Sequence, residues 1–356
     1  RGLYAVKAVT ALYFYQGKSL EKFKHYNKLV VDADWIVHAA SSAGEKRSIQ
    51  AVLKSTGEEW QFKSRTELWG RRRVRDGGFL QELNKERESS YTWEDFDVCD
   101  VQTPEPLPNV LHTAKMMVNS LKQSTGIKDV ELYVGEGKSW RHERSTILEY
   151  KGNRVDNIAP IYKEDVKQYL IKHQGATLVK NLEVDDVVVI KGCESDKTLV
   201  VSVDKDSMGC PISLYNPTHP EWGVLNCRGL GRLWWDTSGK VKKVRGVGRK
   251  FLYFQWLNGD KVDAIEPRAA SEASFGEAAA YNTLVDCRND VECIQAVKDT
   301  YQYFYPKPVT IIGWRGGKIR CDWLYVANEM LDLVRMKRSY EDNVTATDIF
   351  RKFGML

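Results

Sequence analysis

The 356-residue sequence predicts an α/β fold in which a central, mostly parallel sheet is flanked by helices. Short apolar runs of strand length alternate with longer stretches of helical spacing, which is the main evidence for this fold class. A composition of 42% apolar and 28% charged residues is ordinary for a globular chain with a real core. No apolar run approaches the roughly 20 residues that span a bilayer, so we expect no membrane association.

The first strand and helix are expected early in the chain. "KLVV" at 28–31 has the length and composition of a short buried strand, and "WIVHAA" directly after it opens a helix. Further along, helices are predicted at 109–126, where Gly126 provides a stop, and at 163–175. Strands are predicted between and after them, at 129–135 and 198–203.

One segment fits two structures. "LEVDDVVVIKG" at 182–192 has four β-branched residues in succession, which favours a strand. As a helix, the same segment would place Glu183 and Asp186 on one face, because residues three apart are neighbours on a helix. The pattern alone does not choose between the two.

The remaining segments differ from this core in composition. Residues 45–108 are highly charged and are expected to form an insertion within an α/β core that covers 1–206. Residues 207–250 form a basic excursion: eight Lys or Arg against one Asp lie between 226 and 250, together with Trp234 and Trp235. Such a stripe suits a polyanion with stackable bases, although a charge run is also typical of a solvated face. "RRRVR" at 71–75 is a second basic cluster, and residues 251–356 are expected to be helical.

Acidic residues follow three of the predicted strands. The carboxyl ends of parallel strands share one edge of a sheet, so acids placed there converge. Converging carboxylates repel one another unless hard cations offset their charge, and oxygen ligands without His or Cys favour Mg²⁺ or Mn²⁺. The alternative is that each acid merely ends a turn or caps a helix. The predicted metal ligands are Asp32, Asp34, Glu136, Glu183, Asp185, Asp186, Asp204, Asp206, Asp260 and Asp263.

Two other kinds of site are disfavoured. "GKS" at 137–139 lacks the leading glycine of a phosphate-binding loop, because position 132 is Leu132. Cys210, His219 and Cys227 lack the paired spacing of a zinc site. The seven cysteines contain no CxxC and are typical of reduced thiols in a cytoplasm.

Five ordered motifs resemble the bacteriophage 5′→3′ exonucleases of the 5′-nuclease (flap endonuclease, PIN-like) family. They are "VVDADW", "SWRHERSTILEYKGNR", "LEVDD", "VVSVDKDS" and "NGDKVD". The resemblance implies a PIN-like nuclease core with a helical arch and a C-terminal helical region that clamps DNA. It also implies that "LEVDD" begins a helix, and that the acids hold two Mg²⁺ or Mn²⁺ ions.

The resemblance assigns further roles. Lys151 matches the family's catalytic lysine, and Arg154 would share its task of stabilising charge on the scissile phosphate. Tyr150 would stack on a terminal base, and Arg141 and Arg144 would guide the strand. The other predicted DNA contacts are Trp234, Trp235, Lys242, Lys243 and Arg245.

Two features depart from the family pattern. Glu136 stands where the family has Asp, so its oxygens lie about one methylene further out. The helix–three-turn–helix after "GDxxD" is degenerate, because only Gly276 remains as a hairpin glycine.

The implied function is a Mg²⁺-dependent 5′→3′ exodeoxyribonuclease that hydrolyses phosphodiester bonds at DNA 5′ ends. Flap endonuclease or RNase H-like activity would accompany it, so the expected partners are duplex or branched DNA and RNA–DNA hybrids. The implied setting is phage DNA replication and host DNA degradation in the host cytoplasm. The alternative is a non-catalytic nucleic-acid-binding protein that retains the nuclease fold.

Overall fold

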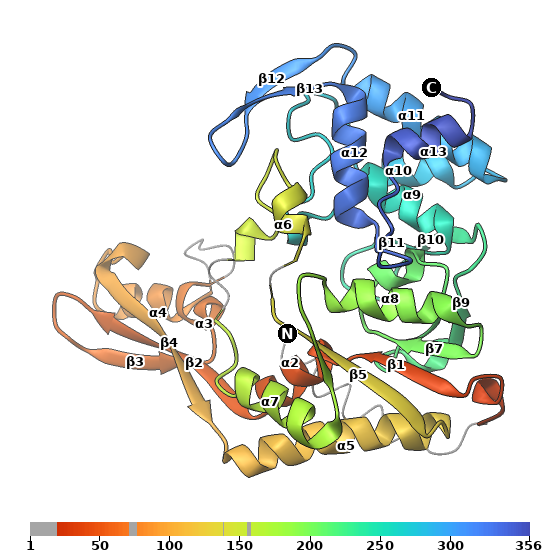
Figure 1. Ribbon diagram of the computed structural model, residues 1–356. Coiled ribbons are helices and arrows are strands. Elements are labelled where there is room, and N and C mark those ends of the chain that lie inside the picture. Colours follow the sequence, from red (N-terminus) through yellow and green to blue (C-terminus); the bar gives the residue numbers. More distant parts are fainter. Residues whose placement is uncertain (1–19, 71–76, 138, 155–157) are drawn as a thin grey trace.

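The computed structural model describes residues 20–70, 77–137, 139–154 and 158–356 (Figure 1). The basic cluster at 71–75 and Lys138 of "GKS" lie outside these ranges.

A six-stranded sheet forms the centre of the molecule, in the order β6-β5-β1-β7-β8-β9. All neighbouring strands pair in parallel except β8 and β9, so the predicted α/β class with a mostly parallel sheet is confirmed. The strands predicted to end in acidic residues are adjacent, with β1 between β5 and β7. The six strands are β1 (Lys28–Asp32), β5 (Asp129–Gly135), β6 (Thr177–Val179), β7 (Thr198–Val201), β8 (Ser213–Tyr215) and β9 (Val224–Asn226).

Each face of the sheet packs against its own hydrophobic core. Leu29 and Val31 of β1 join the cluster beneath α2 (Asp34–Ala43), α5 (Leu107–Thr125) and α7 (Lys163–Gln174). Val30, which points the other way, joins the larger cluster beneath α8 (Val184–Glu194) and the C-terminal helices. A sheet covered on both faces explains why its strands are continuous apolar runs.

The ambiguous segment forms α8, as the family resemblance implies. Val187, Val188, Val189 and Ile190 are all buried, so tertiary packing on both sides overrides their strand propensity. A Cβ at Gly192 would lie 2.5 Å from Val200 of β7, so only glycine allows this helix to approach the sheet so closely.

The 45–108 insertion forms a separate lobe at the left of Figure 1. Its three strands pair antiparallel in the order β3-β2-β4, and they carry a small core of their own around Leu53, Leu68 and Phe96. The predicted charged insertion is therefore a folded unit with polar outer surfaces. Its elements are β2 (Glu45–Leu53), β3 (Glu59–Phe62), α3 (Arg65–Trp69), α4 (Phe79–Glu86) and β4 (Phe96–Pro104).

The 207–250 segment divides into two parts. Its first part contributes β8 and β9 to the central sheet, so the boundary expected at 206 falls within the sheet. Its second part is a two-stranded antiparallel hairpin of β10 (Arg232–Asp236) and β11 (Lys243–Val247), which carries the predicted Trp and basic residues.

The C-terminal third is mainly helical and packs around Trp256. The Trp256 indole donates to Ala327 O at 2.8 Å, and the Tyr301 hydroxyl donates to Trp256 O at 2.6 Å. A hairpin of β12 (Val309–Ile312) and β13 (Lys318–Cys321) interrupts the helices, which the helical expectation for 251–356 did not include. Within the described ranges, no helix is both long and apolar enough to cross a membrane. The helices are α9 (Arg249–Asn258), α10 (Glu277–Leu284), α11 (Asp290–Phe304), α12 (Trp323–Val334) and α13 (Ala346–Lys352).

Candidate active site

A cleft of about 480 Å³ opens where β1, β5 and β7 end. It brings together acids from four separate stretches of the chain, as the strand-end pattern predicts. Seven of the ten predicted ligands line it: Asp32, Asp34, Glu183, Asp185, Asp204, Asp206 and Asp263.

The Asp-x-Asp pairs after β1 and β7 adopt the same local geometry. Asp32 Oδ1 accepts the backbone N–H of Asp34 at 3.0 Å, and Asp204 Oδ1 accepts that of Asp206 at 2.8 Å. The chain therefore turns sharply at each strand end and presents two carboxylates to the cleft. Asp34 reaches across to β5, where its Oδ1 accepts the N–H of Gly135 at 2.9 Å.

Burial and crowding make the charged forms of these acids unfavourable. Burial raises the pKa of Asp32 to about 8, with the neighbouring carboxylates of Asp34 and Asp204 adding to the shift. Desolvation inside the cleft also raises the pKa values of Asp34 and Asp204, although Asp34 is exposed and Asp204 is half-buried. The pKa values of Asp185 and Asp206 lie well above their ordinary range, because both are buried beside other carboxylates. Additional positive charge in the cleft would stabilise the charged forms of these acids.

Carboxylate oxygens are the ligands that hard divalent cations prefer. Asp185 Oδ1 is buried and has no hydrogen-bond partner among the described residues, which is the kind of oxygen that a cation would satisfy. As the side chains lie, no group of three or more Asp, Glu, His or Cys within the described ranges is close enough to hold a metal ion.

Lys151 and Arg154 face the acids across the cleft. Lys151 Nζ lies 2.6 Å from Glu183 Oε1 and 3.8 Å from Asp263 Oδ2, and Arg154 pairs with Asp263. Although burial raises the pKa of Glu183, Arg141 and Lys151 lower it overall to about 2.

The backbone fixes the position of Lys151. Its φ of 59° lies in the left-handed region, which is uncommon for a residue with a side chain. Its N–H donates to Asp263 O at 2.9 Å, so this conformation is held by the segment after α9. Backbone strain of this kind clusters at functional sites.

Asp186 is turned away from the cleft lining. It is 0% exposed and forms a two-pronged pair with the Arg141 guanidinium at 2.8 and 2.9 Å. The same guanidinium contacts Glu183 at 3.0 Å, so Glu183 and Asp186 do share a helix face as expected. Asp186 also accepts the Trp140 indole N–H and the Lys337 backbone N–H. Every oxygen of Asp186 is thus engaged within the protein, unlike Asp185.

Arg141 is not placed to guide a strand over the surface. It begins the short helix α6 (Arg141–Arg144), is 2% exposed, and also donates to the carbonyls of Leu333 and Arg335. It ties the C-terminal segment 333–337 to α8, and Leu333 of that segment lines the cleft. Its charge is neutralised by Asp186 and Glu183 inside the protein, so Arg141 has a structural role and is unsuited to the predicted DNA contact.

Tyr150 is likewise unsuited to the predicted stacking on a base. Only 3% of it is exposed, and its hydroxyl donates to both oxygens of Glu183 at 3.1 Å. The His142 and Tyr150 rings pack in a T-shaped arrangement, and Lys151 Nζ lies 4.7 Å from the centre of the Tyr150 ring. The Tyr150 ring is therefore already in contact with protein side chains.

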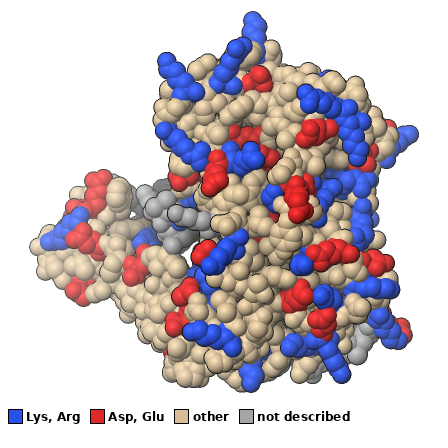
Figure 2. All heavy atoms as spheres, in the orientation of Figure 1, with Lys and Arg blue, Asp and Glu red and all other residues tan. Residues whose placement is uncertain are grey.

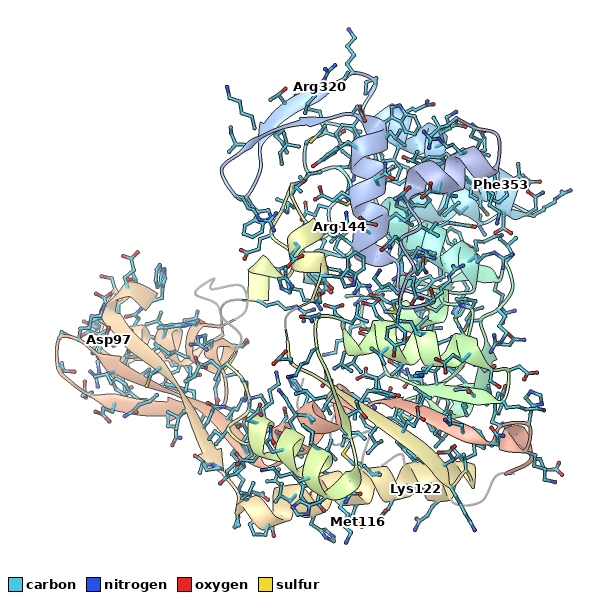
Figure 3. All side chains as sticks on the ribbon, in the orientation of Figure 1. Asp97, Met116, Lys122, Arg144, Arg320 and Phe353 are labelled. Carbon is cyan, nitrogen blue, oxygen red and sulfur yellow. The ribbon has the colours of Figure 1, made fainter. Side chains whose placement is uncertain are left out.

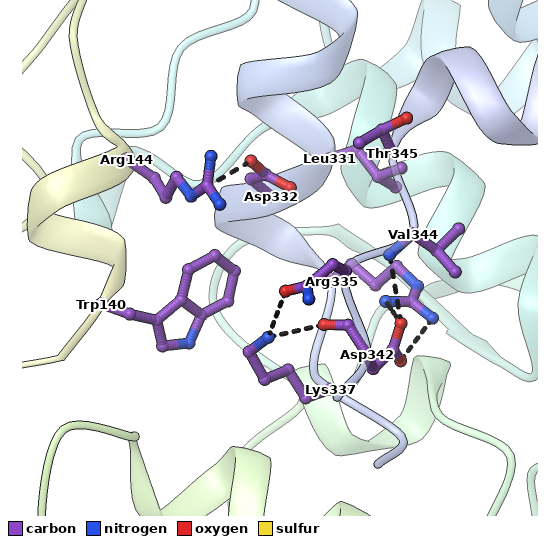
Figure 4. A pocket seen from close by; sticks show the side chains of 10 residues that line it. Trp140, Arg144, Leu331, Asp332, Arg335, Lys337, Asp342, Val344 and Thr345 are labelled. Carbon is purple, nitrogen blue, oxygen red and sulfur yellow. Dashed lines mark hydrogen bonds and ion pairs between the residues drawn. The ribbon is translucent and has the colours of Figure 1, made fainter. Parts of the chain in front are cut away.

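Arg144, the other predicted guide for the strand, is exposed. Its side chain is 59% exposed, and its only ion pair within the described ranges is a long one of 4.0 Å to Asp332. It stands at the edge of a small pocket of about 40 Å³ (Figure 4). The other cations there are occupied: Arg335 pairs with Asp342, and Lys337 donates to the Asp342 carbonyl.

The two remaining predicted ligands lie outside the cleft lining. Glu136 is exposed beyond the end of β5. Asp260 pairs with Lys205 at 2.7 Å and caps the turn at Lys261–Asp263.

The predicted basic contacts lie on the β10–β11 hairpin. Trp234 and Trp235 are half-buried against the main core, and Trp235 packs beside Tyr281. Lys242 is exposed, with Nζ 4.3 Å from the Trp235 ring centre. Lys243 is also exposed. Arg245 is paired with an acid, with its Nε 3.5 Å from Asp236 Oδ2.

Sequence patterns missed three features of the site. Lys163 lines the cleft, and Gln255 donates to Asp206 from α9. The segment 333–337 forms part of the wall. None of these carries a motif, and each reaches the site only through tertiary packing.

Searches against protein-family models and against curated proteins found no match. A search of solved structures found proteins of bacteriophage T5. One, crystallised with metal ions, is 17% identical with a TM-score of 0.37, over 63% of this chain and 79% of that chain. A 5′-exonuclease mutant is 14% identical with a TM-score of 0.35, over 63% and 78%. A flap endonuclease in a complex with DNA and metal ions is 14% identical with a TM-score of 0.34, over 63% and 90%.

The cleft acids predict a pH-dependent stability that divalent cations reverse. Between about pH 4 and pH 8 the folded state holds a proton on Asp32 that the unfolded state has lost, so stability falls as pH rises. Glu183 acts oppositely, but its contribution is lost only as pH falls towards 2. In EDTA we therefore expect a lower melting temperature at pH 8 than at pH 5, and a larger increase on adding MgCl₂ at pH 8. An equal increase in melting temperature on adding MgCl₂ at the two pH values would contradict this prediction. Asp32→Asn should reduce the difference in melting temperature between pH 5 and pH 8 in EDTA.

Proposed function

We propose that this chain is a divalent-metal-dependent 5′→3′ exodeoxyribonuclease that hydrolyses phosphodiester bonds at DNA 5′ ends. The observation that supports this is a single cleft in which seven carboxylates face Lys151 and Arg154. Flap endonuclease or RNase H-like cleavage of structured 5′ ends would use the same groups. The motif resemblance adds the setting of phage DNA replication and host DNA degradation.

Two Mg²⁺ or Mn²⁺ ions would be held by the cleft carboxylates, with Asp185 as the leading candidate because its Oδ1 is buried and unsatisfied. Bound ions of this kind activate water and stabilise the leaving oxygen of a phosphodiester. Asp32 and Asp204, whose charges raise the pKa of Asp185, would hold the ions with it. Asp186 is proposed instead as the residue that positions α8, through Arg141.

Lys151 and Arg154 would act on the scissile phosphate. An ammonium has three donors, and in the free protein Lys151 uses one of them on Glu183. Its remaining donors can contact a phosphate oxygen while the Glu183 contact keeps the side chain aimed at the cleft. Preorganised cations of this kind stabilise charge that develops during phosphodiester cleavage.

The direct test is cleavage of a 5′-labelled DNA duplex in MgCl₂ and in EDTA. We expect short 5′-terminal products with MgCl₂ and none with EDTA. Progressive shortening of the labelled strand from its 3′ end, or equal cleavage in EDTA, would reject the proposal.

Lys151→Ala should lower kcat by about 10²-fold, because a cation aimed at the scissile phosphate is lost. The Kd for DNA in EDTA should change far less. Lys180→Ala is the matched control, since Lys180 is exposed near the end of β6 but does not line the cleft. If Lys151→Ala weakens binding without affecting kcat, the residue only tethers the strand.

A non-catalytic nucleic-acid-binding protein is the second candidate. It is favoured by the absence, within the described ranges, of any acidic group arranged closely enough to hold a metal. DNA binding without cleavage over a range of Mg²⁺ and Mn²⁺ concentrations would establish it in place of the nuclease.

A further inference from the structure

The β12–β13 hairpin has one face packed on the protein and one face open to solvent. Ile311 and Ile319 pair with each other and pack against the main core. Thr310 pairs with Arg320 and Ile312 with Lys318, and all four of these side chains are exposed because alternate residues point to opposite faces. We call these four residues the hairpin outer face.

This face is positively charged and its charge is unpaired. The whole stretch from Pro306 to Cys321 contains Lys307, Arg315, Lys318 and Arg320 and no Asp or Glu. Within the described part of the chain, neither Lys318 nor Arg320 has an ion-pair partner. Figure 2 shows Lys and Arg side chains extending from the top of the molecule, where Figure 1 places this hairpin. Ile312, 64% exposed, lies directly opposite Lys318 and adds an apolar side chain to this face.

The tip of the hairpin is fastened to the segment that carries the site. The Trp314 indole donates to Ser145 O at 2.9 Å, and Arg315 donates to the carbonyls of His142 and Ser145. A Cβ at Gly313 would lie 2.5 Å from Thr146 O, so the two backbones are in close contact. His142 lines the cleft, and Lys151 follows only a few residues after Thr146. The hairpin is therefore held beside the cleft.

We propose that the hairpin outer face binds the phosphate backbone of the DNA strand that the cleft acts on. Lys318 and Arg320 would contact phosphates, and Ile312, opposite Lys318, would contact a neighbouring sugar. The inference rests on the proposed nuclease function and adds a substrate-binding surface outside the cleft. DNA suits this face because its phosphates supply the negative charge that residues 306–321 lack. The phosphates also form a regular row, which the alternate residues Lys318 and Arg320 of β13 can contact.

The test is DNA binding by Lys318→Gln/Arg320→Gln. Binding of a fluorescent 5′-tailed duplex is measured in EDTA over a range of KCl concentrations. We expect about a tenfold weaker Kd, and a plot of log K against log salt that is less steep by about 1.8, because two phosphate contacts are lost. Both residues are exposed, so the melting temperature should not change.

The matched control is Lys115→Gln/Lys122→Gln, which removes the same charge from exposed positions on α5. Figure 3 shows Lys122 and Arg320 at opposite ends of the molecule. The control should keep the wild-type slope and Kd. If the hairpin variant behaves like the control while wild type binds and cleaves DNA, the hairpin proposal is overturned and the nuclease proposal stands. If wild type neither binds nor cleaves DNA, both are overturned.

Discussion

Arg141→Ala is expected to lower the free energy of unfolding by about 3–5 kcal/mol, because it leaves the fully buried carboxylate of Asp186 without its cation. The carbonyls of Leu333 and Arg335 lose their donors in the same change. Urea denaturation measures the loss directly. Asp186→Ala should also act mainly through stability, because it leaves the Arg141 guanidinium with only Glu183 as an acidic partner.

Arg144→Ala provides the control from the same short helix. Its side chain is mostly exposed and its ion pair is long, so the expected change is within about 0.5 kcal/mol. Equal losses for the two arginines would show that the Arg141–Asp186 pair does not hold α8 and the C-terminal segment together.

Asp185→Asn is expected to reduce cleavage by about 10²- to 10³-fold, as when a preorganised charge is removed from a catalytic site. The same change should raise the stability of the metal-free protein at pH 8. The pKa of Asp185 lies well above its ordinary range, because its charged form is buried beside Asp32 and Asp204, and a neutral amide removes that cost. Lost activity with gained stability is a signature that a purely structural residue would not give.

Glu136→Gln is the comparison for this prediction. Glu136 is exposed and does not line the cleft, so cleavage should change by no more than about twofold. A large loss at Glu136, with little at Asp185, would mean that the metal-binding carboxylates are not those of the cleft.

The strand-end acids are the part of the candidate site that local sequence pattern predicts. Asp32, Asp34, Asp204 and Asp206 follow apolar runs, and parallel strands must end at one edge, so their convergence could be predicted before any coordinates. The sequence did not distinguish the roles of adjacent acids within one motif. Asp185 and Asp186 are consecutive, and about 100° of helix rotation sends one to the cleft and the other to Arg141.

The β12–β13 hairpin shows a different limit. Its "GWRGGKIR" turn contains glycines and cations that were visible in the sequence, but its strands are short and lie among strong helical patterns. Its place beside the cleft depends on contacts to residues 142–146, which are far away in the chain.

By itself, the sequence determined the α/β class and the convergence of the strand-end acids, because periodicity and strand direction are local properties. The placement of Lys151 and Arg154 near these acids came from the motif resemblance. Only the tertiary structure decided which charges remain available. Arg141, Tyr150 and Asp186 look like binding residues in the sequence, yet each is buried and neutralised or hydrogen-bonded by partners from distant segments. The free energy of a buried charge depends on those partners, and no local pattern specifies them.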